Sequence, residues 1–234
     1  MNIKENIDDI VKRIEVTCKK AGRNPNDITL IAVSKTVESP KVREALEAGI
    51  DNLGENRVQE LIKKYEDLKD TGIKWHMIGH LQKNKVKYII DKTVLIHSVD
   101  SLSLAEEIDK RAKNKGLVAN VLIELNIGEE ESKFGIKEEN IYDFIKSLEN
   151  FENIRVLGLM TVAPFCENPE DVRWVFKKMK DIYDKISTMN LKNAEMKYLS
   201  MGMTNDFEVA IEEGSNMIRI GTAIFGARKY KEEE

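Results

Sequence analysis

Short apolar runs alternate with amphipathic stretches along almost the whole chain. The opening stretch, from about Asn2 to Ala21, carries isoleucine and valine at mostly helical spacing and predicts an amphipathic helix. Eight apolar runs of strand length follow, and a stretch with helical periodicity separates each run from the next. The expected strands are 28–35, 52–55, 75–79, 94–99, 119–126, 156–162, 197–201 and 217–225. The first helix between them begins at Ser39-Pro40, and the others span 58–68, 84–90, 102–115, 138–148, 169–189 and 205–213.

This order of elements predicts the fold class. Strands that alternate with helices form right-handed crossovers and a parallel sheet, and eight strands of similar length favour closure into a (β/α)8 TIM barrel. The N-terminal helix is then an addition to the barrel. An open doubly wound sheet is the alternative, but the first strand lacks the glycine fingerprint of a dinucleotide-binding fold. Because no low-complexity linker interrupts the chain, we expect residues 1–234 to form a single domain.

The charge balance and the cysteine content argue against several classes of binding partner and structural site. The 37 lysines and arginines nearly balance 41 aspartates and glutamates, and a net charge of −4 provides no basic footprint for nucleic acid or an anionic membrane. Cys18 and Cys166 lie far apart without a Cys/His cluster, which argues against a disulfide framework and a structural zinc site. No signal peptide or 18-residue apolar run is present. We therefore expect a soluble, cytoplasmic protein.

Lys35 ends the apolar run of the first expected strand. In a barrel of this type, the carboxyl ends of the strands and the loops that follow them carry the chemistry. Partial burial there favours the neutral amine, which is a nucleophile suited to Schiff-base formation with an aldehyde or ketone. The structural alternative is a lysine whose ammonium group reaches water from a strand end.

The loops after the seventh and eighth strands together predict an anion site. Gly202 allows close approach of a ligand to the backbone, and Ser200 and Thr204 add hydroxyl groups. The last strand adds Gly221 and Thr222. Barrels often bind phosphate with these two loops, although each loop alone is also compatible with an ordinary helix cap or glycine turn.

Arg219 lies between Ile218 and Ile220, so its guanidinium emerges from an apolar strand and requires a partner. That partner is either a ligand or a buried structural ion pair. His76 and His80 have the i, i+4 spacing of some metal sites, but on a strand this spacing does not form a common ligand face. We therefore expect no metal.

Seven stretches of the chain match, in order, the motifs of one protein family. They are AVSK at 32–35, GENRVQE at 54–60, WHMIGHLQKNK at 75–85, ESKFG at 131–135, GLM at 158–160, SMGMTNDFEVAIEEGS at 200–215 and MIRIGTAIFGAR at 217–228. On these motifs the chain resembles the YggS/PROSC family of pyridoxal-phosphate-binding proteins, which are relatives of the barrel domain of alanine racemase. Leu53 stands where the family often has Phe, and Thr204 where it often has Ser.

The resemblance implies a monomeric barrel in which Lys35 holds pyridoxal 5′-phosphate (PLP) as a Schiff base. It implies that the phosphate is bound by Ser200, Gly202, Gly221 and Thr222. It further implies that Arg219 faces the pyridine nitrogen and that Asn56 and His80 line the pocket near the ring.

The resemblance also implies a role in PLP homeostasis without robust catalysis, with amino or keto acids and PLP-dependent apoenzymes as candidate partners. A cation beside the pyridine nitrogen disfavours its protonation and weakens the ring as an electron sink. The alternative is a weak amino-acid racemase, but a two-base racemase needs a second acid or base on the opposite face. The chain ends at Glu234, soon after the eighth expected strand, and we expect no second β-domain to supply one.

Overall fold

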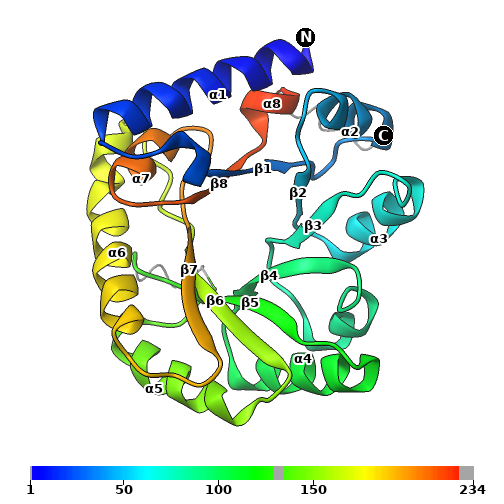
Figure 1. Ribbon diagram of the computed structural model, residues 1–234, viewed down its shortest axis with the longest axis vertical. Coiled ribbons are helices and arrows are strands. Elements are labelled where there is room, and N and C mark those ends of the chain that lie inside the picture. The colour runs from blue at the N-terminus through cyan, green and yellow to red at the C-terminus, as the bar shows by residue number, and fades with distance from the viewer. Residues whose placement is uncertain (1, 129–133, 227–234) are drawn as a thin grey trace, which may run out of the picture.

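The computed structural model describes residues 2–128 and 134–226, and its centre is a closed barrel of eight parallel strands that follow one another in chain order (Figure 1). The strands are β1 (Thr29–Val33), β2 (Asn52–Glu55), β3 (Lys74–Met77), β4 (Thr93–Val99), β5 (Ala119–Leu125), β6 (Ile154–Thr161), β7 (Ala194–Ser200) and β8 (Met217–Ile220). Pairing of β1 with β8, from Thr29 opposite Met217 to Ala32 opposite Ile220, closes the barrel. The predicted (β/α)8 barrel is confirmed.

Helical elements surround the strands (Figure 1). The α-helices are α1 (Ile3–Lys20), α2 (Ser39–Glu47), α3 (Val58–Asp67), α4 (Leu102–Lys115), α5 (Ile141–Ser147), α6 (Arg173–Ser187), α7 (Phe207–Glu212) and α8 (Thr222–Phe225). The 3₁₀ elements are η1 (Pro25–Asp27), η2 (Lys83–Tyr88), η3 (Glu138–Asn140), η4 (Leu148–Asn150) and η5 (Pro169–Val172). The expected N-terminal helix is α1, which the Asn2 side chain caps by accepting from the N–H groups of Lys4 and Glu5. It lies outside the barrel against α7 and α8.

Two expected elements differ in the structure. The α-helix expected at 84–90 is the 3₁₀ element η2, whose i to i+3 hydrogen bonds include Lys85 N to Gln82 O and Ile89 N to Val86 O. The strand expected at 217–225 ends at Ile220, because the Gly221 carbonyl accepts from the N–H groups of Ile224 and Phe225 and starts α8. The apolar run of the sequence continues past the end of the strand because the side chains of Ile224 and Phe225 in α8 are also buried.

Strand alternation divides the buried side chains between two regions. Side chains on the outward faces pack against the helices and form the main core. A smaller apolar cluster, which includes Ile31, Leu95, Leu122 and Met217, fills part of the barrel interior. Buried polar side chains, which include His76, His97, Ser200 and Arg219, occupy other positions in the interior.

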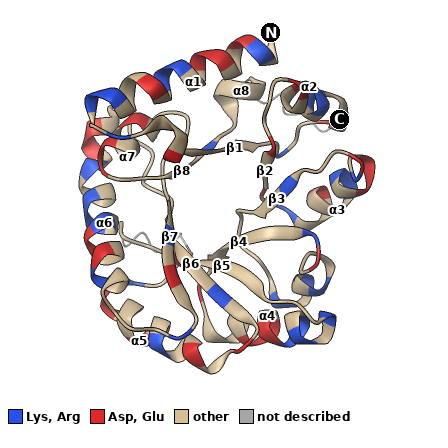
Figure 2. Cartoon of the chain, viewed as in Figure 1, with Lys and Arg blue, Asp and Glu red and all other residues tan. Residues whose placement is uncertain are grey.

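Lys and Arg are interspersed with Asp and Glu along the visible helices (Figure 2). This distribution agrees with the near balance of charge in the sequence. Within the described ranges, no helix combines the length and apolar character required to cross a bilayer.

Candidate functional site

A cavity of about 1160 Å³ brings together residues from the carboxyl ends of several strands of the barrel and from the loops that follow them. Lys35 enters it from the loop after β1 and Asn56 from the loop after β2, while β8 and the turn after it contribute Arg219, Gly221 and Thr222. Five of the eight site residues predicted from the sequence therefore share one cavity. Its size exceeds that of a typical small-molecule pocket, so a cofactor and part of a second molecule fit within it.

Ser200 and Gly202 are not among the residues that line this cavity. Ser200 is fully buried, and its hydroxyl contacts Arg219 in the barrel interior. Gly202 has a φ of +96°, and a Cβ there would lie 2.7 Å from the Cβ of Ala210. The glycine is thus required by the left-handed backbone and by close packing against α7.

His80 lies in a separate group of side chains at the ends of β3 and β4. Its Nδ1 is 3.3 Å from Oδ2 of Asp100, and its ring stacks on Phe134 with the centroids 3.7 Å apart. His76, four residues earlier, instead points into the barrel interior and contacts His97. The two histidines do not share a ligand face, and the described residues contain no group of three His, Cys, Asp or Glu that could hold a metal ion. Of the ESKFG motif at 131–135, residues 131–133 lie outside the described residues, as do 227–228 of the last motif.

Hydrogen bonds on both sides of Lys35 fix the turn that carries it. The Ser34 carbonyl accepts from Lys64 Nζ at 2.5 Å, and the Thr36 N–H donates to Oε2 of Glu60 at 2.8 Å. Thr36 has a φ of +65°, a left-handed conformation that is costly for a β-branched residue. Two charged side chains of α3 thus hold a strained turn in place, with half-buried Lys35 at its centre.

A buried ion pair lies directly behind this turn. Lys64 Nζ is 2.6 Å from Oε1 of Glu55, which also accepts from the Ser34 hydroxyl at 2.6 Å. Burial raises the pKa of the Glu55 carboxyl, while Lys64 and the Ser34 hydroxyl act in the opposite direction. Glu55 and Lys64 lie between β2 and α3, so the pair ties the strand, the helix and the Lys35 turn together.

Arg219 is 4% exposed and reaches the cavity from β8. Its Nη1 donates to Ser200 Oγ at 2.6 Å, and its Nη2 donates to the Thr161 carbonyl at 2.8 Å. Burial lowers its pKa to about 10, with Asp206 and Glu124 acting in the opposite direction. The guanidinium therefore remains charged at neutral pH.

Asn56 places an unsatisfied acceptor at the cavity. Its Oδ1 is buried and has no hydrogen-bond partner within the described protein. Gly79, at the end of β3, allows the backbone to approach this residue, because a Cβ there would lie 2.4 Å from the Asn56 carbonyl oxygen. A buried polar atom without a partner is rare and indicates that a ligand or water completes the site.

The loop between β7 and α7 forms another wall of the cavity through Met203, Thr204 and Asn205. Asp206 shapes this loop, since its Oδ1 accepts from the Met203 N–H at 2.6 Å. Gly221 and Thr222 line the same cavity, so the two turns predicted to bind an anion are brought together. In these two loops the hydroxyl groups on the lining belong to Thr204 and Thr222, whereas that of Ser200 is in the interior.

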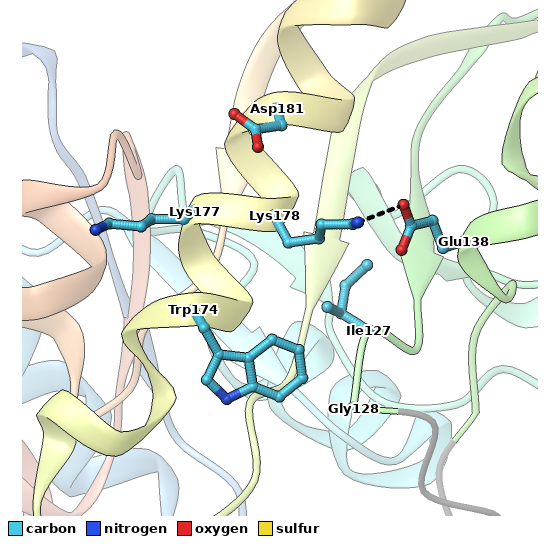
Figure 3. A pocket seen from close by; sticks show the side chains of 7 residues that line it. All are labelled: Ile127, Gly128, Glu138, Trp174, Lys177, Lys178 and Asp181. Carbon is cyan, nitrogen blue, oxygen red and sulfur yellow. Dashed lines mark ion pairs between the residues drawn. The ribbon is translucent and has the colours of Figure 1, made fainter.

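A second hollow, of about 560 Å³, lies on the outer surface beside α6 (Figure 3). Lys178 reaches across it to Glu138, with 2.8 Å between Nζ and Oε1, while Lys177 points away. The other residues that line it are Ile127, Gly128, Trp174 and Asp181. None of the predicted site residues contributes to this hollow.

The sequence analysis missed several polar residues around the site. Lys64 occupies the apolar face of its helix together with Val58 and Leu61, and a lysine on such a face is a detectable signal. His97 lies two residues after Leu95 and therefore shares its inward face. The contribution of Phe165 and Cys166 to the cavity wall carries no comparable sequence signal, because the loop after β6 has no regular periodicity.

Comparison with known proteins identifies relatives over nearly the full chain. Residues 6–229 match the family described as alanine racemase, N-terminal domain. A protein of Aquifex aeolicus (strain VF5) named pyridoxal phosphate homeostasis protein is 49% identical over 230 residues, which cover 98% of this chain and 100% of that protein.

Solved structures share the barrel. The structure of PipY of Synechococcus elongatus PCC7942 with PLP bound superposes with a TM-score of 0.80 at 31% identity, covering 92% of this chain and 100% of PipY. An alanine racemase of Clostridium difficile 630 superposes with a TM-score of 0.68 at 19% identity, covering 98% of this chain and 56% of the racemase. The likeness to the racemase is one of fold.

Proposed function

The chain belongs to the alanine racemase N-terminal domain family and, within it, to the pyridoxal phosphate homeostasis proteins, and from this we propose that it binds PLP and serves PLP homeostasis. The observation that carries the proposal is that Lys35, from the loop after the first strand, lines one cavity with Arg219, Gly221 and Thr222, from the last strand and the turn after it. PLP presents an aldehyde, a pyridine ring and a phosphate. The cavity offers an amine, a guanidinium and a hydroxyl-bearing turn.

The residues present fit such a cofactor. The unpartnered Oδ1 of Asn56 offers an acceptor for a polar substituent of the ring, and the cavity volume of about 1160 Å³ is ample. Bound PLP would supply an aldehyde that forms a covalent bond with an amine.

We assign the groups as follows. Lys35 would hold the cofactor, because its amine can form a Schiff base with the PLP aldehyde with release of one water. Gly221 and Thr222 hold the phosphate, with Thr204 on the facing loop. Arg219 faces the pyridine nitrogen, and Asn56 lies near the ring. His80, which contacts Asp100 and Phe134, lies at the edge of the pocket near the ring.

A binding role, rather than robust catalysis, agrees with the charge of Arg219. Because this guanidinium stays protonated at neutral pH, it disfavours a second positive charge on the pyridine nitrogen. The ring is then a weaker acceptor of negative charge from a bound amino acid.

We further propose that the protein acts as a cytoplasmic monomer that exchanges PLP with amino or keto acids and PLP-dependent apoenzymes. Both cysteines, Cys18 and Cys166, are free thiols, in agreement with a reducing compartment. Phe165, which is 81% exposed, lies at the cavity wall and offers an apolar contact near the mouth. Light scattering tests the monomer, and recovery of activity by an apoenzyme mixed with the PLP-loaded protein tests transfer.

Titration of the purified protein with PLP, followed by its visible absorption, tests the main proposal. We expect a new band in the wild type, loss of the band in Lys35→Ala, and retention in Lys41→Ala. Lys41 lines the same cavity and is the matched control. A band that survives in Lys35→Ala would place the covalent bond elsewhere. Rapid interconversion of D- and L-alanine that depends on Lys35 would replace the binding role with a racemase.

A further inference from the structure

A line of buried polar side chains crosses the barrel interior beneath the cavity. Ser200 on β7 and His97 on β4 are fully buried, and His76 on β3 is 3% exposed. Such groups are costly to bury, and apolar side chains fill the neighbouring interior positions. Their presence in this interior therefore calls for a functional explanation.

At the end of the line nearest the cavity, Ser200 contacts Arg219. Nη1 of Arg219 donates to Ser200 Oγ at 2.6 Å, and Ser200 Oγ lies 3.2 Å from Nδ1 of His97. His97 Nε2 then lies 3.0 Å from Nδ1 of His76. The two rings meet edge to face, with 72° between their planes.

The far end reaches the opposite surface of the barrel. His76 Nε2 lies 3.0 Å from Oδ1 of Asn52, and Asn52 Nδ2 donates to Oδ1 of Asp51 at 2.5 Å. Asp51 also forms an exposed ion pair with Lys74, with 2.6 Å between the charged atoms. Hydrogen bonds thus connect the amino end of the barrel to the guanidinium at the cavity.

The hydrogen-bonding capacity of Asn52 determines which atom donates and which accepts at every step of the line. Asn52 donates to Asp51 through its amide nitrogen, so its Oδ1 faces His76 and can only accept. His76 therefore donates from Nε2 and accepts at Nδ1. His97 likewise donates from Nε2 and accepts at Nδ1, where the Ser200 hydroxyl donates. The reverse direction would place two acceptors, His76 Nε2 and Asn52 Oδ1, face to face.

Burial favours a neutral imidazole at both His76 and His97. Burial lowers the pKa of His76 to about 4, with Asp51 opposing this change and Lys74 adding to it. Burial also holds the pKa of His97 well below its ordinary value, and both His76 and Arg219 act in the same direction. Each ring then has one donor and one acceptor, as the line requires.

We propose that Ser200 and His97 are positioning residues that hold the Arg219 guanidinium in a single orientation at the cavity, with His76 and Asn52 anchoring the line. Ser200 accepts from Arg219 and donates to His97, so it acts on a ligand through Arg219. It is then not a phosphate ligand, in contrast to the role that the family resemblance implies. The orientation of a ligand by Arg219 rests on the proposed function, whereas the hydrogen-bond line does not.

The first test uses the protein without PLP. Nitrogen NMR of imidazole-labelled protein should show His76 and His97 as neutral Nε2–H tautomers between about pH 5.5 and 8. A charged ring in this range, or an Nδ1–H tautomer for either residue, would overturn the proposal. This outcome does not depend on PLP binding, so it separates failure of the line from failure of the proposed function.

The second test compares PLP with pyridoxal, which lacks the phosphate. Ser200→Ala should weaken both ligands by the same factor, on the order of tenfold, because one hydrogen bond to a charged group is lost. It should also shift the pH midpoint of the visible band. Ser200→Thr, which keeps the hydroxyl, should restore both properties.

Leu95→Ala is the matched control, since Leu95 shares the interior but not the line. It should lower thermal stability without moving the pH midpoint. Weakening of PLP alone in Ser200→Ala would make Ser200 a phosphate ligand and overturn the proposal. If Ser200→Ala and Leu95→Ala had equal effects on both ligands, Ser200 would act only through packing of the interior, and the proposal would also be overturned.

Discussion

Glu124 is 9% exposed at the carboxyl end of β5, and its Oε2 has no hydrogen-bond partner among the described residues. Burial raises the pKa of this carboxyl to about 7, with Asp100 acting in the same direction and Arg219 opposing it. The folded state therefore favours the neutral acid. This contribution to stability is present below the unfolded value of 4.5 and is lost as the pH rises through about 7.

Glu124→Gln should remove this pH dependence. Relative to wild type, the free energy of unfolding of the variant should be about 2–3 kcal/mol higher at pH 8.5 than at pH 5, because only wild type loses stability between these pH values. Chemical denaturation at both pH values measures the difference. Comparison with wild type is needed because His76, whose pKa is lowered to about 4, contributes a dependence of opposite sign at acid pH. If the free energies of unfolding of variant and wild type differed by the same amount at the two pH values, the raised pKa of Glu124 would be contradicted.

Individual residues were predictable where a polar side chain ends or interrupts an apolar strand. Lys35 and Arg219 met this criterion, and both line the cavity. His97 also met it, but its role depends on a contact with His76, which is 21 residues away and on another strand. Ser200 shows the limit of the approach, since its place in a glycine-containing loop motif did not reveal that its hydroxyl points into the interior.

The turn between β1 and α2 depends on α3 for its shape. Lys64→Met should lower the free energy of unfolding by about 3 kcal/mol, because it leaves the Glu55 carboxyl buried without its ion pair. It should also weaken PLP binding, since the Ser34 carbonyl beside Lys35 loses its donor. Lys63→Met, on the exposed face of the same helix, is the control.

A double variant measures the interaction between Glu55 and Lys64 apart from other effects of each substitution on stability. Adding Glu55→Gln to Lys64→Met should recover part of the lost stability, because the uncompensated charge is removed. Urea denaturation of the two single variants and the double variant gives the coupling. Additive losses would show that Glu55 and Lys64 act independently.

At the level of elements, hydrophobic periodicity predicted the strands and most helices within a few residues. It placed α4 at the observed bounds, because a buried apolar stripe and the left-handed Gly116 cap define this helix. It failed for η2 and for the end of β8. Val86 and the buried Ile224 and Phe225 supply apolar positions, but periodicity over so few residues does not distinguish a 3₁₀ turn, a short helix and a strand.

Closure of the barrel turns distant sequence motifs into one site. β1 and β8 are neighbours in space, so the loop that carries Lys35 lies beside the turn of Gly221 and Thr222. The alternation of strands and helices predicted this closure, and it also placed the loops that we predict to bind an anion at the carboxyl ends of the strands. The depth of each side chain could not be predicted, because it depends on strand register and on packing across the barrel.

The central claim is that Lys35, within this cavity, holds PLP covalently. Borohydride reduction of the PLP-loaded protein, followed by proteolysis and mass spectrometry of the peptides, identifies the modified residue. We expect the pyridoxyl group on Lys35, and we expect Lys41 in the same cavity to remain unmodified. Modification of Lys41 or of a surface lysine in place of Lys35, or no modification at all, would contradict the account.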